Sequence, residues 1–462
     1  MTGMVRVSAV PVGFGRAVLG AGVLALGLAG APMAQDFTTL KGHGGPIMGL
    51  AVAEDGRVGS ASFDNSVGLW QGRTPTWLEG HAAAVTAVVF TPSGVPVSAG
   101  DDFTIRAWDV AGGRIVGRHA GKILGLAVSP DGAWLASGSW DGSVRLWSLA
   151  AGGGADSIEL ASPGAGVNDV EFSPDGATLY AATTQGALLA YQLADGSGTP
   201  VTLVRHGFGL NEIERGPDWI AYGAVDGGTR VIEAASGTAI ADFTLDRRPI
   251  LAMAHHPGAG LLAVGDGQGY IMIVDTGNWR ITRDFQATRE GPVWALAFSP
   301  DGTVIHAGGL DDVVYAWPVA LLDTFDAAMG QERSFLREAD TMDNGERQFM
   351  RKCSICHALE PGPSRKAGPS LHGVFGRQAG RVAGYGYSPT LQGSDIVWGD
   401  ETIDALFDLG PDHYIPGSKM PMQVISGAGD RADLIAFLRQ ATAGSGEEHG
   451  AHQEPGQDEM KE

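Results

Sequence analysis

A unit of about forty residues recurs along the front part of this 462-residue chain, and it constrains the fold more than any other feature. The unit is clearest from Arg118 to Trp147, where apolar runs alternate with Asp-Gly turns such as Asp141-Gly142. These runs predict antiparallel strands joined by tight hairpins. Counterparts begin near His43, His81, His119, Gly164, Gly207, Arg248 and Gly291, which gives seven units.

The same residue types recur at fixed places in these units. A Gly-His or Arg-His pair opens the first three units. In these units and in unit seven, an Asp in a turn precedes a Trp by six residues. The residues are Gly42-His43, Gly80-His81, Arg118-His119, Asp64, Asp102, Asp141, Asp311, Trp70, Trp108, Trp147 and Trp317. They resemble the signature of WD40 repeats, which implies an all-β, seven-bladed propeller over residues 36–320.

The resemblance implies that each His, Asp and Trp set forms a buried, hydrogen-bonded brace inside a blade. A catalytic triad is the alternative, but a brace recurs from blade to blade, whereas a catalytic site need occur only once. Units four to six have lost most of the brace, and Gln185, Asp226 and Gly267 stand near their turn positions. We expect these units either to have drifted or to have become adapted to binding.

The two ends of the repeat region predict how the ring closes. Unit seven supplies three strands up to Trp317 with no fourth after it, whereas Phe37-Thr38-Thr39-Leu40 stands alone before unit one. Pairing this first strand with the last blade would remove the exposed edges.

Two thiols and an imidazole stand together at Cys353-Ser354-Ile355-Cys356-His357. This spacing is the attachment signature of a c-type haem, because both thiols can reach the vinyl groups while the adjoining imidazole meets the iron. A zinc half-site or a redox pair is the alternative, but zinc would need further ligands and the chain has only these 2 cysteines. We expect one covalently attached haem c and no structural disulfide.

Further motifs stand on both sides of this site, in the family's order. They are Gly345 with Phe349, residues 366–373, residues 397–402, residues 414–420 and residues 433–438. Together they resemble a class I cytochrome c of the mitochondrial and bacterial c2 type. The resemblance implies an all-α domain at residues 342–443, in which a last helix bearing Leu434 and Phe437 crosses a first helix at Gly345 and Phe349. The chain is thus expected to be multidomain, with a seven-bladed WD40-like propeller followed by this domain.

The haem ligands and their surroundings can also be predicted. Met420 offers a soft thioether in a Pro-Gly turn, which makes it the expected sixth iron ligand beside His357, with His372 and Met422 as competitors. By the resemblance, Pro369 accepts a hydrogen bond from the His357 ring. It also implies that Tyr387 and Trp398 bind a haem propionate and that Arg377 compensates its charge.

The termini and the link between the domains have their own signals. Residues 1–34 read as a secretory signal peptide, with Arg6 and Arg16, an apolar run and small residues before Ala34, although a retained membrane anchor is the alternative. Covalent haem attachment agrees with export, so we expect a bacterial periplasmic protein without a later membrane span. Residues 321–341 predict a helical linker, and the acidic tail 444–462 predicts disorder, with His449 and His452 as weak metal ligands at most.

The formal charge of −21 excludes a nucleic-acid role and favours redox partners with basic docking faces. Locally, a basic ring is expected near the haem edge, formed by Arg347, Arg351, Lys352, Lys366 and Lys419.

Three functions remain open at this stage. The first is single-electron transfer with the propeller as a docking platform, for which no catalytic residue is assigned. The second is a redox enzyme whose propeller binds a further cofactor or substrate, on the architecture of a nitrite reductase that joins a cytochrome c to a propeller. His255-His256 would be its ligand candidates, although such a pair before Pro257 fits a plain turn. The third is a sensing module.

Overall fold

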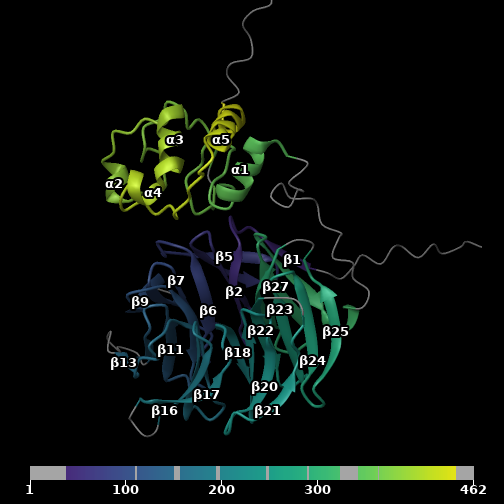
Figure 1. Ribbon diagram of the computed structural model, residues 1–462. Helices are drawn as coiled ribbons and strands as arrows, with labels where there is room; N and C mark the ends of the chain where they lie inside the picture. Colours follow the sequence, from purple (N-terminus) through teal and green to yellow (C-terminus); the bar gives the residue numbers. More distant parts are fainter. Residues whose placement is uncertain are drawn as a thin grey trace, which may run out of the picture. The chain divides into compact units, whose positions relative to one another are not determined.

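A computed structural model describes residues 38–109, 112–149, 157–193, 198–245, 249–288, 291–322, 342–362 and 364–443 (Figure 1). The expected signal peptide, nearly all of the expected linker and the expected disordered tail lie outside these residues. Only residues 321 and 322 of the linker are described, and Leu321 is the last residue of a 3₁₀ turn at Val319–Leu321.

The described strands form seven four-stranded antiparallel sheets, which are the seven expected blades. Blade 1 holds β2 (Ile47–Val52), β3 (Val58–Ser62), β4 (Ser66–Gln71) and β5 (Thr74–Glu79); blade 2 holds β6 (Val85–Phe90), β7 (Pro96–Gly100), β8 (Thr104–Asp109) and β9 (Gly112–Arg118); blade 3 holds β10 (Ile123–Val128), β11 (Trp134–Ser139), β12 (Val144–Ser148) and β13 (Ser157–Glu159); blade 4 holds β14 (Val167–Phe172), β15 (Thr178–Thr183), β16 (Ala187–Gln192) and β17 (Pro200–Arg205). Blade 5 holds β18 (Leu210–Arg215), β19 (Trp219–Ala224), β20 (Thr229–Glu233) and β21 (Ala239–Asp242); blade 6 holds β22 (Ile250–His256), β23 (Leu261–Asp266), β24 (Tyr270–Asp275) and β25 (Arg280–Gln286); blade 7 holds β26 (Val293–Phe298), β27 (Val304–Gly309), β28 (Val313–Pro318) and β1 (Thr38–Lys41).

The ring closes as the sequence predicts. The first strand β1 pairs antiparallel with β28 of the last blade, so that Leu40 lies opposite Val314. Because β1 comes from the other end of the propeller sequence, this pairing completes the fourth strand of blade 7 and fastens the two ends of the ring together.

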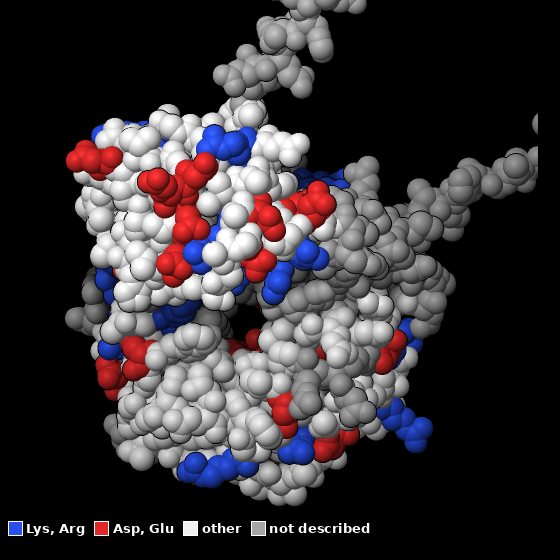
Figure 2. Space-filling model, turned by 45° about the horizontal axis from the view of Figure 1, so that its top comes forward, with Lys and Arg blue, Asp and Glu red and all other residues white. Residues whose placement is uncertain are grey.

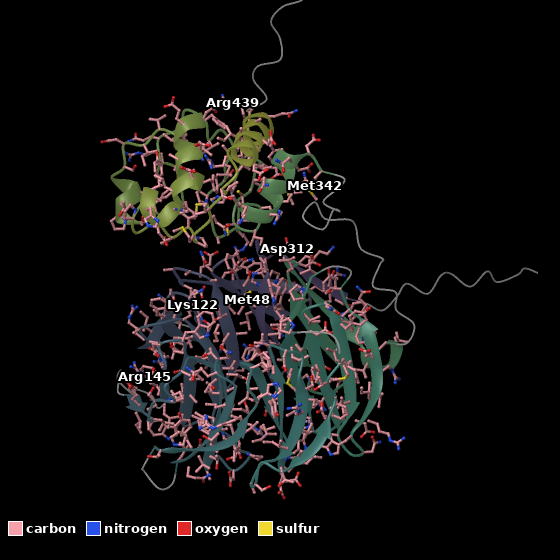
Figure 3. The ribbon with its side chains drawn as sticks, viewed as in Figure 1. Met48, Lys122, Arg145, Asp312, Met342 and Arg439 are labelled. Atoms are coloured by element: carbon pink, nitrogen blue, oxygen red, sulfur yellow. The ribbon has the colours of Figure 1, made fainter. Side chains whose placement is uncertain are left out.

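The blades pack through buried apolar layers. The second strand of each blade is almost completely buried, as in β3 and β19, because it lies between neighbouring strands and between neighbouring blades. One such layer joins blades 6 and 7 through Ala263, Ile271 and Ile305. Figure 3 shows Met48 of β2 towards the middle of the ring and Arg145 of β12 at its edge.

Antiparallel order gives the propeller two distinct faces. Turns between the first and second strands, and between the third and fourth, open on one side, which we name face 1. Turns between the second and third strands, and the links from blade to blade, open on the other side, which we name face 2.

The predicted brace is present in blades 1–3 and includes a serine that the sequence did not reveal. In blade 1 the Trp70 indole N–H donates to Ser60 Oγ at 2.7 Å, the Ser60 hydroxyl donates to His43 Nε2 at 2.7 Å, and His43 Nδ1 donates to Asp64 at 2.9 Å. The same order recurs through Ser98 in blade 2 and Ser137 in blade 3. Since every member is hydrogen-bonded, these buried polar groups stabilise the blades rather than perform chemistry.

Two blades depart from the expected distribution of this brace. Blade 5, which the sequence places among the degenerate units, keeps a His206 Nε2 to Asp226 bond of 2.9 Å. In blade 7 Asp311 instead accepts a hydrogen bond from the Tyr315 hydroxyl. A tyrosine thus takes the place of the histidine in the last blade.

The C-terminal part is the expected all-α domain. Its helices are α1 (Asn344–Lys352), α2 (Pro389–Gln392), α3 (Asp400–Leu409), α4 (Pro411–Tyr414) and α5 (Ala428–Ala441). Helices α1 and α5 cross where predicted: a Cβ on Gly345 would lie 2.1 Å from the Asp433 carbonyl oxygen, and the Phe349 and Phe437 rings lie 5.5 Å apart. Glycine is therefore needed for this close approach. Within the described ranges, no helix is long and apolar enough to cross a membrane.

Candidate haem site

The predicted cofactor residues of the helical domain line one cavity. These residues are Cys353, Cys356, His357, Pro369, Arg377, Tyr387, Trp398 and Met420. Apolar side chains form much of its wall, among them Leu391, Ile403 and Phe407. A cavity with an apolar wall and a few convergent polar groups is the usual form of a cofactor site.

The two thiols are placed by the end of α1. The Cys353 N–H donates to the Phe349 carbonyl at 2.8 Å, and both Cys356 and His357 donate to the Cys353 carbonyl at 3.1 and 2.9 Å. One tight turn after the helix therefore carries both sulfurs and the imidazole. Burial raises the pKa of the Cys353 thiol to about 12 and also raises the pKa of Cys356, so both thiols are neutral at neutral pH.

The imidazole of His357 is oriented by the backbone that follows. Its Nδ1 donates to the Pro369 carbonyl at 2.8 Å, which is the contact that the resemblance implies. A carbonyl can only accept, so Nδ1 carries the proton and the Nε2 lone pair is left for a metal. Burial lowers the pKa of His357, although the bond to Pro369 opposes this, and the ring is therefore neutral as a ligand must be.

Gly368 is a site residue that sequence reasoning did not single out. A Cβ at this position would lie 2.5 Å from the His357 ring and 2.8 Å from the Cys356 carbonyl oxygen. Its own N–H donates to that carbonyl at 2.7 Å. The absence of a side chain therefore lets the 367–370 loop approach the imidazole closely enough for the Pro369 bond.

Met420 is the thioether that faces the cavity. Neither of the competing ligands, His372 and Met422, is among the residues that line it, and Met422 is 45% exposed. The turn before Met420 is held by a backbone bond from Met420 to Ser418 Oγ at 3.1 Å, and Gly417 has a φ of 79°. That left-handed conformation favours glycine.

Arg377 makes backbone contacts in addition to its expected role of compensating the charge of a haem propionate. Its guanidinium donates to the carbonyls of His372 at 2.7 Å and Ser370 at 2.9 Å. It therefore braces the loop that follows Pro369, besides lining the cavity. The Tyr387 hydroxyl accepts a 3.3 Å bond from the Val382 N–H. The propionate contacts that the resemblance implies for Arg377, Tyr387 and Trp398 stay predictions.

The propeller histidines suggested for a second cofactor lie in different surroundings. His256 Nδ1 accepts from the Ala259 N–H and its Nε2 donates to the Pro300 carbonyl, so both nitrogens hold the turn. The His255 ring instead packs on Trp219, with ring centroids 4.7 Å apart. Across the parts of the chain that the structure describes, no group of three or more His, Cys, Asp or Glu residues is arranged to hold a metal ion.

The residues fit a covalently attached haem. Two cysteines stand one turn apart, a neutral imidazole is oriented by a carbonyl, and a thioether faces the same apolar cavity. Fold and site together define an electron-transfer haemoprotein joined to a β-propeller.

Comparisons with known proteins agree with both halves of this description. Residues 342–442 match the Cytochrome c family, and residues 35–71, 72–109, 114–148 and 279–318 match the WD domain, G-beta repeat family. The helical domain is 44% identical over 99 residues to cytochrome c of Ginkgo biloba, a match that covers 21% of this chain and 87% of that protein. It is 46% identical over 100 residues to cytochrome c of Gossypium barbadense (21% and 88%) and 42% over 105 residues to that of Chlamydomonas reinhardtii (23% and 93%). Through this domain the chain belongs to the cytochrome c family.

Proposed function

We propose that the protein is an exported electron carrier that holds one covalent haem c and docks a redox partner on its propeller. The observation that carries this proposal is the single cavity lined by Cys353, Cys356, His357 and Met420. A haem held by His and Met ligands exchanges one electron between ferric and ferrous iron and has no open coordination position.

The residues around the cavity have separable tasks in this proposal. The thiols of Cys353 and Cys356 hold the macrocycle, and the Pro369 carbonyl keeps His357 in the ligating tautomer. The apolar wall excludes water, which favours the less charged state of the site. Arg377 keeps the 369–372 loop in position through its two carbonyl contacts.

The proposed compartment is the periplasm of a bacterium. It rests on the signal-like composition of residues 1–34 and on covalent haem attachment, which by the family resemblance takes place on the exported side of the bacterial membrane. Both cysteines of the chain stand in the attachment motif, which leaves none for a disulfide.

The propeller has a surface suited to docking a protein. Exposed apolar side chains lie on turns and links of face 2 in blades 2 to 5, and we name them the apolar patch: Phe103 (39% exposed), Trp140 (53%), Phe208 (58%) and Val225 (47%). Lys122, labelled in Figure 3, lies 5.8 Å from the Trp140 ring centroid and donates to Asp101 at 2.6 Å. Large apolar side chains rimmed by charged groups are typical of protein interaction sites.

Charge supports a basic partner. The whole chain has a formal charge of −21, whereas the helical domain carries basic and acidic side chains close together on the face seen in Figure 2. Lys352 and Lys419 line the haem cavity. Opposite charges between such a carrier and its partner would raise the association rate at low salt.

The electron-transfer proposal is tested on purified full-length protein exported with its own signal. We expect one haem and one iron per chain, a reversible one-electron titration, and a reduced form that does not bind carbon monoxide. A second chromophore, or turnover of nitrite, would favour the enzyme instead.

The docking proposal is tested with proteins captured from periplasmic extract by the full chain. Electron exchange with the true partner should slow at least about tenfold in the double variant Trp140→Ala/Phe208→Ala. The matched control is Ile158→Ala/Ile281→Ala, which removes exposed apolar side chains from the outer strands β13 and β25. Equal electron-exchange rates in the two double variants would show that the apolar patch does not dock the partner.

A further inference from the structure

A second hollow lies on face 1 of the propeller, between blades 5 and 6. It has a volume of about 400 Å³ and is lined by eight residues, of which Asp218, Trp219, Ile240, His255, Pro257 and Trp279 matter here. We name it the indole pocket. Figure 1 labels strands of both blades next to one another, among them β18 and β20 of blade 5 and β22 and β24 of blade 6. The volume is in the range of small-ligand sites.

Three aromatic rings meet in this pocket. The Trp219 and Trp279 rings are nearly perpendicular, at 87°, with centroids 5.1 Å apart, and the His255 ring meets Trp219 at 69° and 4.7 Å. Trp219 is almost completely buried, with its ring packed against both neighbours, whereas Trp279 is only half-buried. Trp279 is therefore the ring that can offer a π face to a ligand. The faces of aromatic rings carry negative potential and attract cations.

The two indoles are held in place by their surroundings. A Cβ on Gly216 would lie 2.2 Å from the Trp219 ring, so the backbone presses directly on it, and Trp219 is 6% exposed. Trp279 has a φ of 55°, a left-handed conformation that is rare for a bulky residue, while its N–H donates to the Asp275 carbonyl at 2.8 Å. A glycine or asparagine would suit this turn better, so the indole is retained at a conformational cost.

The charge of the pocket is negative. Asp218 supplies its only carboxylate. Burial, together with the nearby Arg215 guanidinium, lowers the pKa of His255 to about 4, opposed by the bond with the Arg215 backbone, so this ring is neutral at neutral pH. Arg215 is itself paired with Glu171 at 3.1 Å, which reduces its repulsion of a cation. A carboxylate beside aromatic faces favours a ligand that is both cationic and apolar.

We propose that the indole pocket binds a small organic cation whose charged nitrogen carries methyl or other alkyl groups. Alkylated ammonium groups combine positive charge with low hydration, which is what aromatic faces recognise, whereas a bare ammonium prefers water. This site is separate from the haem cavity and from the apolar patch on face 2, and it does not depend on electron transfer or on partner docking.

The test compares choline with 3,3-dimethylbutan-1-ol, which has the same shape but a carbon in place of the charged nitrogen. Binding to the full-length holoprotein is measured by calorimetry and by saturation-transfer NMR. We expect saturable choline binding that is at least about tenfold tighter than that of the alcohol. Equal binding of both probes would reduce the pocket to an unselective apolar hollow, and no saturable choline binding would overturn the proposal.

Variants then locate the site. Trp279→Ala should weaken choline binding at least about tenfold, Trp279→Phe should keep part of it, and Asp218→Asn should weaken it several-fold while reducing its salt dependence. The Phe variant decides the case if the Ala variant fails to fold. Trp134→Ala, which removes an indole from β11 in blade 3, is the control and should bind choline normally.

A short peptide with one arginine or lysine serves as the competing ligand. If it binds more tightly than choline and shows the same loss in Trp279→Ala, the pocket takes a basic side chain of a partner protein and the small-cation proposal is wrong.

Discussion

The propeller and the helical domain achieve order in opposite ways. Each of blades 1–3 carries its own closed polar network, from an indole through a serine and a histidine to an aspartate, and its own share of the apolar layers between blades. The helical domain has one crossing of α1 and α5 and a single apolar core, part of which also lines the cavity. The propeller can therefore be stabilised by repetition, whereas a haem bound in the cavity would complete the packing of the helical domain.

Removal of both thiols should produce the largest contrast between the two parts. In Cys353→Ser/Cys356→Ser, haem should be lost on denaturing extraction, and residues 342–443 should become sensitive to protease while the propeller stays resistant, because only the helical domain packs around the cofactor. Limited proteolysis with mass spectrometry of the fragments measures this. Ser354→Ala, a change between the same two cysteines, should keep its haem. Haem that stayed attached in the double variant would rule out the assigned attachment.

Replacement of the sixth ligand should have a narrower effect, confined to the haem. Met420→Ala should lower the reduction potential and let carbon monoxide bind the reduced protein, because the thioether stabilises ferrous iron and fills the sixth position. Redox titration and absorbance spectra measure both effects, and Met422→Ala, an exposed neighbour, is the matched control. An unchanged absorbance spectrum in Met420→Ala would show that another group is the sixth iron ligand.

Within the propeller, the network of blade 3 should matter more than the remnant in blade 5. His119→Ala should reduce the free energy of unfolding by about 2–3 kcal/mol, because it leaves Ser137 and Asp141 without their buried partner. His206→Ala should cost about 1 kcal/mol, since Asp226 is 24% exposed and water can replace the histidine. Urea unfolding followed by circular dichroism compares the two. Equal losses of unfolding free energy in the two variants would show that the hydrogen bond between Ser137 and His119 adds no stability.

Acid should weaken the same network by a smaller amount. Burial alone would raise the pKa of Asp141, but hydrogen bonds from Ser143 and Ala120 and the contact with His119 lower it to about 2. A lowered pKa means that the contribution of Asp141 is complete above pH 4 and is lost as the pH falls towards 2. Over that interval wild-type propeller stability should fall by ~1–2 kcal/mol more than that of Asp141→Asn. Parallel pH profiles for the two proteins would contradict this origin of the acid sensitivity.

Features that depend on short or repeating stretches of sequence could be predicted from the sequence alone. The haem pentapeptide at residues 353–357 has its chemistry within one turn, so no tertiary information is needed to recognise it. The seven blades follow from a pattern that repeats along the chain, and the closure by β1 follows from a lone strand at one end and a three-stranded unit at the other. The crossing at Gly345 could be anticipated because the motifs occur in a familiar order.

Contacts between distant residues were decided by the tertiary structure. Serine is common in this chain, and only the register of β3 against β4 shows that Ser60 joins Trp70 to His43. The surviving bond of His206 in blade 5 was hidden because its blade lacks the rest of the signature.

At the haem cavity and the indole pocket, too, sequence alone could not predict which distant residues meet. Gly368 looks like any loop glycine until the structure places the His357 ring within 2.5 Å of where its Cβ would be. The indole pocket joins Trp219 and Trp279, which stand sixty residues apart in different blades and meet because antiparallel strands bring alternate turns to one face. Sequence alone therefore determined the cofactor chemistry and the repeating frame, since both are local or periodic. The tertiary structure decided which side chains meet, because that depends on strand register and on how neighbouring blades pack.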